Sequence, residues 1–543
     1  MKIPRIALGL CSAAILSCSP DRAAPADAGG AEPRTGGTVV VAVAEDIASA
    51  NPLVSQFDVP RDFLRIALFL PLVDYGPGLE FRPVLAESWE MTGDTGVVFT
   101  LRDDVTWHDG VRTTAYDAKF TYDRATDPAT AYPGAGELAW ITGVEVIDSF
   151  AIRFSWRPHS DPLAAFPFFP IVPAHLLGAI PPGGMAAADF NTSPVGNGPF
   201  RFVSRRPGER WEFAANADFS PSLGGRPYID RLIWRSITEP SARNVELQTG
   251  AVDVVLNAGA DAFPGLVADE RLDGIIRESR NYAMVGWNGR RAPFGDPVVR
   301  RALMMATDRQ RMVEVLRGGQ ATLAIGPVGP FHWAYADSIT PLPFDTSGAR
   351  AALADAGITD RDGDGTLDLP DGRPFAFDLN YPTEQTFTRD VAELIANDLT
   401  AIGVRVTLRP IEFNTLVGRM TSSARDFDAV VMGWASDYRV NLRDPFHSAA
   451  LAGPYQIAGY ANPEVDALID SVALIVDRAE ATAPYHRLQS ILRNEQPWGF
   501  LYYFPDLNVV RTRLNGVEMD VRGTFISVAR WWVGDAPAAR GSD

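Results

Sequence analysis

Three side chains with complementary chemistry follow a short apolar run in the second half of the chain. Residues 427–434 are mostly apolar and include adjacent β-branched valines, which predicts a buried strand. Trp434 ends this run, and Asp437 and Tyr438 come just after it. Because ligands of α/β proteins collect beyond the carboxyl ends of strands, an indole, a carboxylate and a phenol at such an end predict a recognition surface for a solute. The alternative is an ordinary turn that caps the strand.

A second group of carboxylates has the spacing of a calcium-binding loop. Aspartates occupy the first, third, fifth, ninth and twelfth positions of this loop, and these are Asp360, Asp362, Asp364, Asp368 and Asp371. Gly365 stands at the sixth position, where an EF-hand loop needs glycine, but Asp371 replaces the longer glutamate that normally binds through both oxygens. The sequence therefore predicts either a structural calcium site or an exposed polar turn. We expect no other cofactor.

Sequence patterns for catalysis are absent. The two lysines, Lys2 and Lys119, belong to neither a phosphate-binding loop nor a Ser-x-x-Lys motif. The six histidines are scattered, and no two of them form the i, i+4 pair of a zinc protease. An exported hydrolase would need a nucleophile and a base, and only a carboxylate pair assembled from dispersed acids stays open. We therefore expect that the protein is not an enzyme.

Length and charge narrow the class of protein further. A chain of 543 residues exceeds the size that one hydrophobic core supports, so we expect two or three domains. The formal net charge of −18 disfavours nucleic acid as a partner, because nucleic acid binds to basic surfaces. After the N-terminus, no segment approaches the ~20 apolar residues of a transmembrane helix.

The N-terminus has the pattern of an export signal. Basic residues precede an apolar run, residues 6–16, that is too short to span a bilayer. A small residue and Cys18 follow, which resembles the acylation site of a bacterial lipoprotein and predicts a signal peptide over residues 1–18. The alternative is ordinary cleavage nearer residues 24–28. Residues 19–36, rich in Ala, Pro, Gly and Asp, predict a flexible tether.

Several ordered motifs surround these candidate residues. The most specific covers residues 83–124, in which an alternating strand pattern turns at Asp109-Gly110 and is followed by a helix that begins near Thr114. Further motifs follow in order, at residues 194–200, 247–253, 293–309, 459–463 and 497–503. This arrangement resembles the family 5 extracellular solute-binding proteins, the dipeptide- and oligopeptide-binding components of ABC importers, a family that also includes nickel and sugar binders. The resemblance extends from Gly37 to about Val533.

The resemblance implies an α/β fold of the two-lobe periplasmic-binding-protein type (type II, cluster C), with a hinge between the lobes. Carried onto this sequence, lobe I comprises residues 37–280 plus 505–533, with an extra subdomain at about residues 77–190. Lobe II comprises residues 281–504, and residues 534–543 form a disordered tail. Local patterns support an α/β second lobe, because a helix pattern ending at Gly403 is followed by alternating strand residues.

The resemblance also implies a function. The protein would be a lipid-anchored, extracytoplasmic monomer, periplasmic or on the cell surface, that captures a small solute and delivers it to an ABC permease. A short peptide is the leading ligand, because Asp437 matches the family position whose carboxylate pairs with the peptide α-ammonium and Trp434 matches the adjacent aromatic residue. The chain departs from the family by adding Arg439 and Arg443 before Asp444-Pro445, which favours a carboxylate-bearing solute. The open alternatives are an oligosaccharide, a metal chelate or a small cation as the solute, and a sensing or adhesion lipoprotein without a permease.

Overall fold

A computed structural model describes residues 32–55, 58–383, 386–436 and 438–534 of the chain. From Arg34 onward, the described residues form one compact unit. The predicted signal peptide, most of the predicted tether and nearly all of the predicted tail lie outside the described residues. Cys18 and Asp437, two of the predicted functional residues, also lie outside them.

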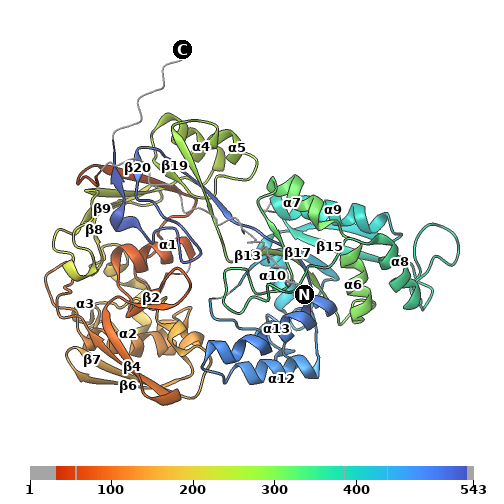
Figure 1. The fold of residues 1–543 in the computed structure, drawn as a ribbon, viewed down its shortest axis with the longest axis horizontal. Helices are drawn as coiled ribbons and strands as arrows, with labels where there is room; N and C mark the ends of the chain where they lie inside the picture. The colour runs from red at the N-terminus through yellow and green to blue at the C-terminus, as the bar shows by residue number, and fades with distance from the viewer. Residues whose placement is uncertain (1–31, 56–57, 384–385, 437, 535–543) are drawn as a thin grey trace, which may run out of the picture. The chain divides into compact units, whose positions relative to one another are not determined.

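The first large sheet has seven strands in the order β12-β19-β11-β1-β10-β9-β8. Figure 1 labels β8, β9 and β19 of this sheet. Their bounds are Leu272–Arg277, Asp506–Arg511, Val254–Val255, Thr38–Val43, Arg231–Ser236, Arg210–Ala215 and Phe200–Arg206. The central strand β1 runs parallel to β10 and β11, and both of its faces are covered. Val39, Val41 and Val43 pack into one hydrophobic core, and Ala42 packs into another with Leu247 of helix α4 (Pro240–Thr249). Burial on both faces explains why the sequence of β1 is continuously apolar.

The second sheet has six strands in the order β14-β18-β13-β17-β15-β16. Their bounds are Thr322–Leu323, Trp498–Tyr503, Asn281–Trp287, Ala429–Ala435, Ala376–Pro382 and Arg405–Ile411. The strand predicted at residues 427–434 is β17, which lies inside the sheet between β13 and β15. We use lobe I for the part of the chain around the first sheet and lobe II for the part around the second.

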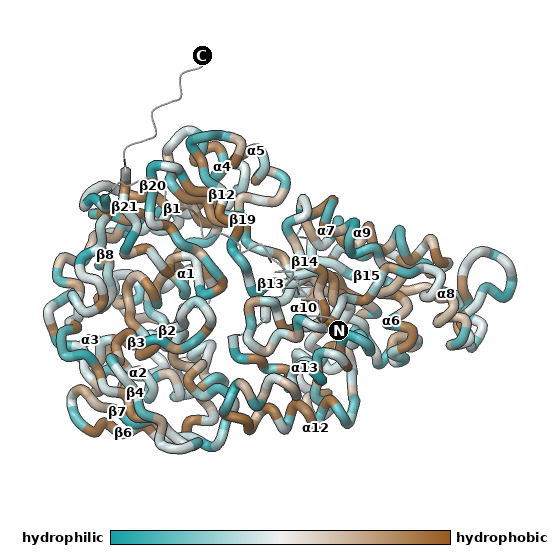
Figure 2. The backbone as a smooth tube through the Cα atoms, viewed as in Figure 1, coloured by the Kyte–Doolittle hydropathy of each residue, from teal (hydrophilic) through white to brown (hydrophobic). Residues whose placement is uncertain are grey.

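Helices cover both faces of the second sheet. One core contains residues of α6 (Pro297–Met305), α7 (Arg309–Arg317) and α9 (Thr386–Thr400). The other contains residues of α10 (Phe413–Thr421), α12 (Pro463–Val472) and α13 (Arg478–Glu495). Figure 2 shows apolar and polar residues alternating along α12 and α13, as expected when one side of each helix is buried. Among the described residues, no helix is long and apolar enough to cross a membrane.

The chain passes between the two sheets twice, at residues 278–280 and at residues 504–505. The two crossings are adjacent, because Ser279 Oγ donates a hydrogen bond to the carbonyl of Phe504 (2.6 Å) and the Phe504 amide donates to the carbonyl of Asn281 (3.2 Å). Two short neighbouring segments of this kind are a natural hinge. Which residues move together as each lobe stays a prediction.

Lobe I carries a further four-stranded antiparallel sheet, in the order β4-β5-β7-β6. Its strands are Ala86–Met91, Gly96–Leu101, Ala151–Trp156 and Ile141–Asp148, and helix α2 (Ala115–Thr126) packs on β6 and β7. The helix begins after Thr114, as the sequence predicts, with the Thr114 amide donating to Asp117 Oδ2 (2.8 Å). His108 connects this region to the motif at residues 194–200, because Nδ1 accepts from the Gly196 amide (3.1 Å) and Nε2 contacts the Gly198 carbonyl (3.0 Å). A Cβ atom on Gly196 would come within 2.0 Å of the Leu68 carbonyl oxygen, so this turn requires glycine.

Candidate functional site

A cavity of about 340 Å³ lies between the two lobes. On the lobe I side it is lined by the segment around Arg65, by the carboxyl ends of β11 and β12 and by the start of β19. On the lobe II side its lining includes Asn281, Tyr438 and Arg439. The cavity therefore lies beside the crossings and beyond the carboxyl ends of strands, where ligands of α/β proteins usually bind.

The described lining of this cavity carries more positive than negative charge. It contains five arginines, namely Arg61, Arg65, Arg277, Arg280 and Arg439, and three carboxylates, namely Asp62, Glu137 and Asp506. Each of these carboxylates is paired with an arginine, since Asp62 contacts Arg65, Glu137 contacts Arg439 and Asp506 contacts Arg277. Three of the five arginines therefore have a carboxylate of the same lining as a partner.

Arg65 is the most deeply buried of these arginines, with 3% of its side chain exposed. It lies in a π-helical turn (Leu64–Leu68), and its guanidinium contacts Asp62 and Asp74, each at 2.9 Å. Burial opposes the charge of Arg65, but the carboxylates of Asp74 and Asp62 outweigh burial and raise its pKa. Removing one partner of a buried ion pair leaves the other charge uncompensated. The contacts with Asp62 and Asp74 therefore stabilise Arg65 in its position in the cavity wall.

Tyr438 connects lobe II to lobe I. Its ring stacks on Phe168 and Tyr75 of lobe I, with centroid distances of 4.7 Å and 5.5 Å, and its hydroxyl donates to the carbonyl of Val521. The guanidinium of Arg280 lies 4.9 Å from the centroid of the same ring. Burial raises the pKa of Tyr438, so the phenol remains protonated and continues to donate at neutral pH. The side chain thus lines the cavity and at the same time holds the two lobes together.

Trp434 lines a different cavity from Tyr438. It lines a separate cavity of about 30 Å³ and packs against Trp498 of β18, with ring centroids 4.9 Å apart. Among the predicted site residues that the structure describes, Tyr438 therefore borders the large cavity and Trp434 the small one. Asp437 lies outside the described residues, so its role as a ligand stays a prediction.

Two further ion pairs join the lobes beside the large cavity. Arg439 contacts Glu137 and lies 3.0 Å from His159 Nε2, both in lobe I. Arg478, the first residue of α13, makes two hydrogen bonds to Asp161 of lobe I, at 3.1 Å and 2.8 Å. The lobes are therefore in contact on this side of the cavity.

The sequence patterns did not predict several residues of the cavity lining, chiefly Arg65, Arg277, Asp506 and Asn508. Arg65 had a signal, because it is a single arginine within the otherwise apolar residues 63–70, and an isolated charge in such a run indicates a buried pair. Arg277 and Asp506 come from strands far apart in the sequence and meet through the pairing of β12 with β19. No local pattern marks Asn508.

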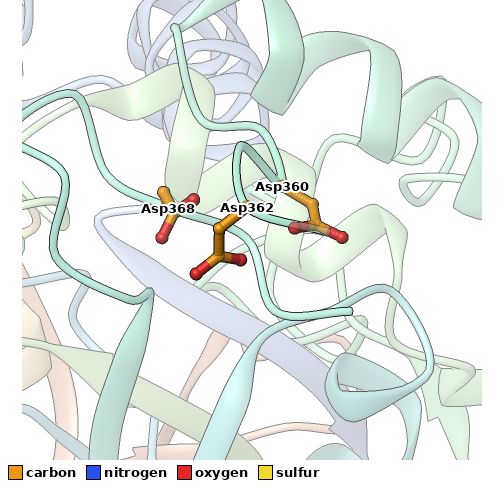
Figure 3. Close-up of side chains that lie close together, drawn as sticks. All are labelled: Asp360, Asp362 and Asp368. Atoms are coloured by element: carbon orange, nitrogen blue, oxygen red, sulfur yellow. The ribbon is translucent and has the colours of Figure 1, made fainter. Parts of the chain in front are cut away.

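The predicted calcium loop brings three of its five aspartates together (Figure 3). Carboxylate oxygens of Asp360, Asp362 and Asp368 all lie within 4.8 Å of one another. The other two aspartates do not belong to this group; Asp364 Oδ1 accepts from the Thr366 amide (2.6 Å) and Asp371 pairs with Arg373 (2.8 Å). Three convergent carboxylates suit a hard cation such as calcium, but exposed acidic turns of this shape also form without one, so the site stays a prediction.

Comparison with known proteins agrees with this geometry. The profile described as "Bacterial extracellular solute-binding proteins, family 5 Middle" matches residues 80–444. The chain belongs to this family. The predicted family and the two-lobe α/β fold are thus confirmed. The family consists of solute-binding proteins, which are extracytoplasmic and are not enzymes.

Relatives and a solved structure extend the match to nearly the whole chain. The oligopeptide-binding protein AppA of Bacillus subtilis is 28% identical over 508 residues, which cover 92% of both chains. The di/tripeptide-binding protein 2 of Pseudomonas aeruginosa is 28% identical over 485 residues, covering 83% of this chain and 87% of that protein. The structure of AppA from Bacillus subtilis in complex with a nonapeptide has a TM-score of 0.77 and 27% identity, and covers 93% of this chain and 100% of that one.

Proposed function

We propose that the protein captures short peptides in the cavity between its lobes and delivers them to the membrane subunits of an ABC importer. The observation that carries this proposal is the cavity of about 340 Å³, to which both lobes contribute. Pockets for small ligands commonly measure about 300–1,000 Å³, so this cavity suits a solute of a few residues. Its polar side chains can pair with peptide backbone groups, while Tyr132 and Phe168 offer aromatic surface to apolar side chains.

The relatives support a peptide as the solute. AppA and the di/tripeptide-binding protein 2 carry peptide binding in their names, and AppA was solved with a nonapeptide. Asp437 is proposed to pair with the α-ammonium of the peptide. Its neighbour Tyr438 lines the cavity, which supports this role.

Calorimetry with one tripeptide in free and N-acetylated forms tests the proposal. Losing one partner of a desolvated charge pair costs ~2–5 kcal/mol, so acetylation is expected to weaken binding about 30-fold or more. Asp437→Asn should weaken binding of the free peptide to the same extent and leave the unfolding temperature nearly unchanged. Equal affinities for the free and acetylated peptides would remove Asp437 from this role.

A carboxylate-bearing solute that is not a peptide is the second candidate. Arg439, one of the two arginines that the chain adds after Tyr438, lines the cavity and favours it. Native mass spectrometry of protein purified without denaturation distinguishes the two, because the mass of a retained solute identifies its class. In either case we propose that the protein acts as a monomer, anchored to the membrane through acylated Cys18.

A further inference from the structure

A histidine of lobe I faces an arginine of lobe II beside the large cavity. His159 follows β7 and is half-buried, and Nη1 of Arg439 lies 3.0 Å from its Nε2. Next to it, the Ser160 amide donates a hydrogen bond to the carbonyl of Ala473 in lobe II (2.9 Å). The described lining of the large cavity contains Arg439 but neither His159 nor Ser160, so these two residues contact the other lobe and not the solute.

The contact with Arg439 determines the protonation state of His159. Every polar hydrogen-bonding atom of a guanidinium is a donor, so Nε2 of His159 must be the acceptor, and the neutral ring carries its proton on Nδ1. A protonated imidazole has an N–H at both nitrogens, and it would turn a donor and a positive charge toward Arg439. Protonation of His159 and this contact between the lobes therefore exclude each other.

The neighbours of His159 do not offset this repulsion. Glu137 contacts Arg439 through Nη2, whereas His159 faces Nη1, so the carboxylate already has a partner. The ring of Trp140 packs against His159 with a centroid distance of 4.6 Å, but it belongs to lobe I and remains beside the histidine when the lobes separate. Among these neighbours, only Arg439 is removed from His159 by opening of the lobes.

Asp161 and Arg478 form the other charged pair of this contact. Arg478 donates to both oxygens of Asp161 (3.1 Å and 2.8 Å), so this carboxylate is also engaged. Burial raises the pKa of Asp161, and protonation of the carboxyl at low pH would weaken this pair as well. Its contribution must be separated from that of His159 by experiment.

We infer that His159 makes closure of the lobes sensitive to pH, because the neutral ring accepts from Arg439 in the closed form and the protonated ring repels it. Acidification therefore favours the open form and weakens binding of the solute. The inference rests on the proposed function in taking the solute to be bound by the closed form.

The direction and size of the effect follow from the two states of the histidine. Burial and the charge of Arg439 lower the pKa of His159 to about 4 in the closed form. With the lobes apart, we expect the ordinary value of about 6.5. The open form then binds more protons between these values, so affinity is complete above about pH 6.5 and falls as the pH drops toward about 4. Between pH 7.0 and 5.5, the apparent Kd is expected to rise about 8-fold.

Calorimetry with Ala-Ala-Ala at pH 7.0 and 5.5 tests the inference, because this peptide has no side chain that titrates. In His159→Gln, the amide oxygen can accept from Arg439 and cannot be protonated in this range, so the Kd is expected to change by less than about 2-fold between the two pH values. Asp161 is unchanged in this variant, so its contribution is the pH dependence that remains. His175→Gln is the matched control, since His175 contacts Asp109 (2.7 Å) within lobe I, and it should keep the 8-fold change.

The outcomes separate this inference from the proposed function. A wild-type Kd that does not change, or one that changes equally in His159→Gln, would overturn the inference and leave peptide capture intact. If Ala-Ala-Ala binds at neither pH, peptide capture fails, and an NMR titration of His159 in the protein alone tests the contact. A pKa well below 6.5 that Arg439→Gln raises would support the inference, and any other result would overturn it.

Discussion

The ion pair between Arg478 and Asp161 offers a test of lobe closure that leaves the cavity lining largely untouched. Arg478 Nε and Nη2 contact Asp161 Oδ1 and Oδ2 at 3.1 Å and 2.8 Å, and Asp161 is 8% exposed. The two residues belong to different lobes, so the pair forms in the closed protein and separates if the lobes open. Asp161→Asn removes the charge, keeps the shape and suits the left-handed backbone at this position (φ 46°).

The free energy that the closed form loses in Asp161→Asn depends on how deeply the two partners of the ion pair are buried. Removing one member of a desolvated interfacial ion pair costs ~2–5 kcal/mol. Arg478 is 25% exposed and keeps its hydrogen bond to the Leu79 carbonyl (2.7 Å), so its charge is partly solvated after the substitution. We therefore expect Asp161→Asn to destabilise the closed form, and not the open form, by about 1–2 kcal/mol. This change raises the apparent Kd about 5- to 30-fold.

Calorimetry with Ala-Glu-Ala measures the change in affinity, and small-angle scattering over a peptide titration measures closure through the radius of gyration. The wild type is expected to become more compact as peptide is added, and Asp161→Asn to need more peptide for the same change. Asp269→Asn is the control, because Asp269 makes an equally bidentate pair (3.0 Å and 2.7 Å) inside lobe I with Arg271, whose side chain is exposed to solvent. Unchanged affinity and an unchanged scattering titration for Asp161→Asn would refute the reasoning.

Three further predictions concern the anchor, the calcium loop and the effect of pH. Cys18→Ala is expected to release the protein from membranes, since several acyl chains anchor at ~0.8 kcal/mol per buried CH₂; equal retention in membrane fractions would contradict acylation. Calcium at about 100 times its Kd is expected to stabilise the wild type by about 2.7 kcal/mol in thermal unfolding, and Asp360→Asn by much less; equal shifts would exclude the site. Burial lowers the pKa values of His108 and His332 to about 4, below the value of about 6.5 in the unfolded chain. The unfolded state therefore binds more protons between these values, and stability should fall by up to ~1.4 kcal/mol per pH unit and histidine as the pH drops from about 6.5 to about 4; a flat profile of unfolding temperature would contradict this.

The sequence predicts the parts of the fold that depend on neighbouring residues along the chain. Strand β17 was predicted at residues 427–434 and spans Ala429–Ala435, because its apolar, β-branched residues fit a buried strand whatever surrounds them. The helix after Thr114 likewise begins where its cap residues predict.

The candidate site depends on contacts that no local pattern records. Trp434 and Tyr438 are four residues apart, yet Trp434 packs against Trp498 within lobe II while the ring of Tyr438 enters an aromatic cluster of lobe I. Arg277 meets Asp506 across 229 positions of sequence through strand pairing. Side-chain direction and sheet register decide both outcomes, and a single sequence specifies neither of them directly.

The segment after β17 contacts both the cavity and lobe I. Tyr438 and Arg439 both line the cavity, and both contact lobe I, through Phe168 and Glu137 respectively. The wall of the cavity on the lobe II side is therefore in part the same structure that holds the lobes together. A solute that fills the cavity lies beside these contacts, and opening the lobes removes both side chains from it together. The free energy of closing the lobes consequently enters the affinity for every solute.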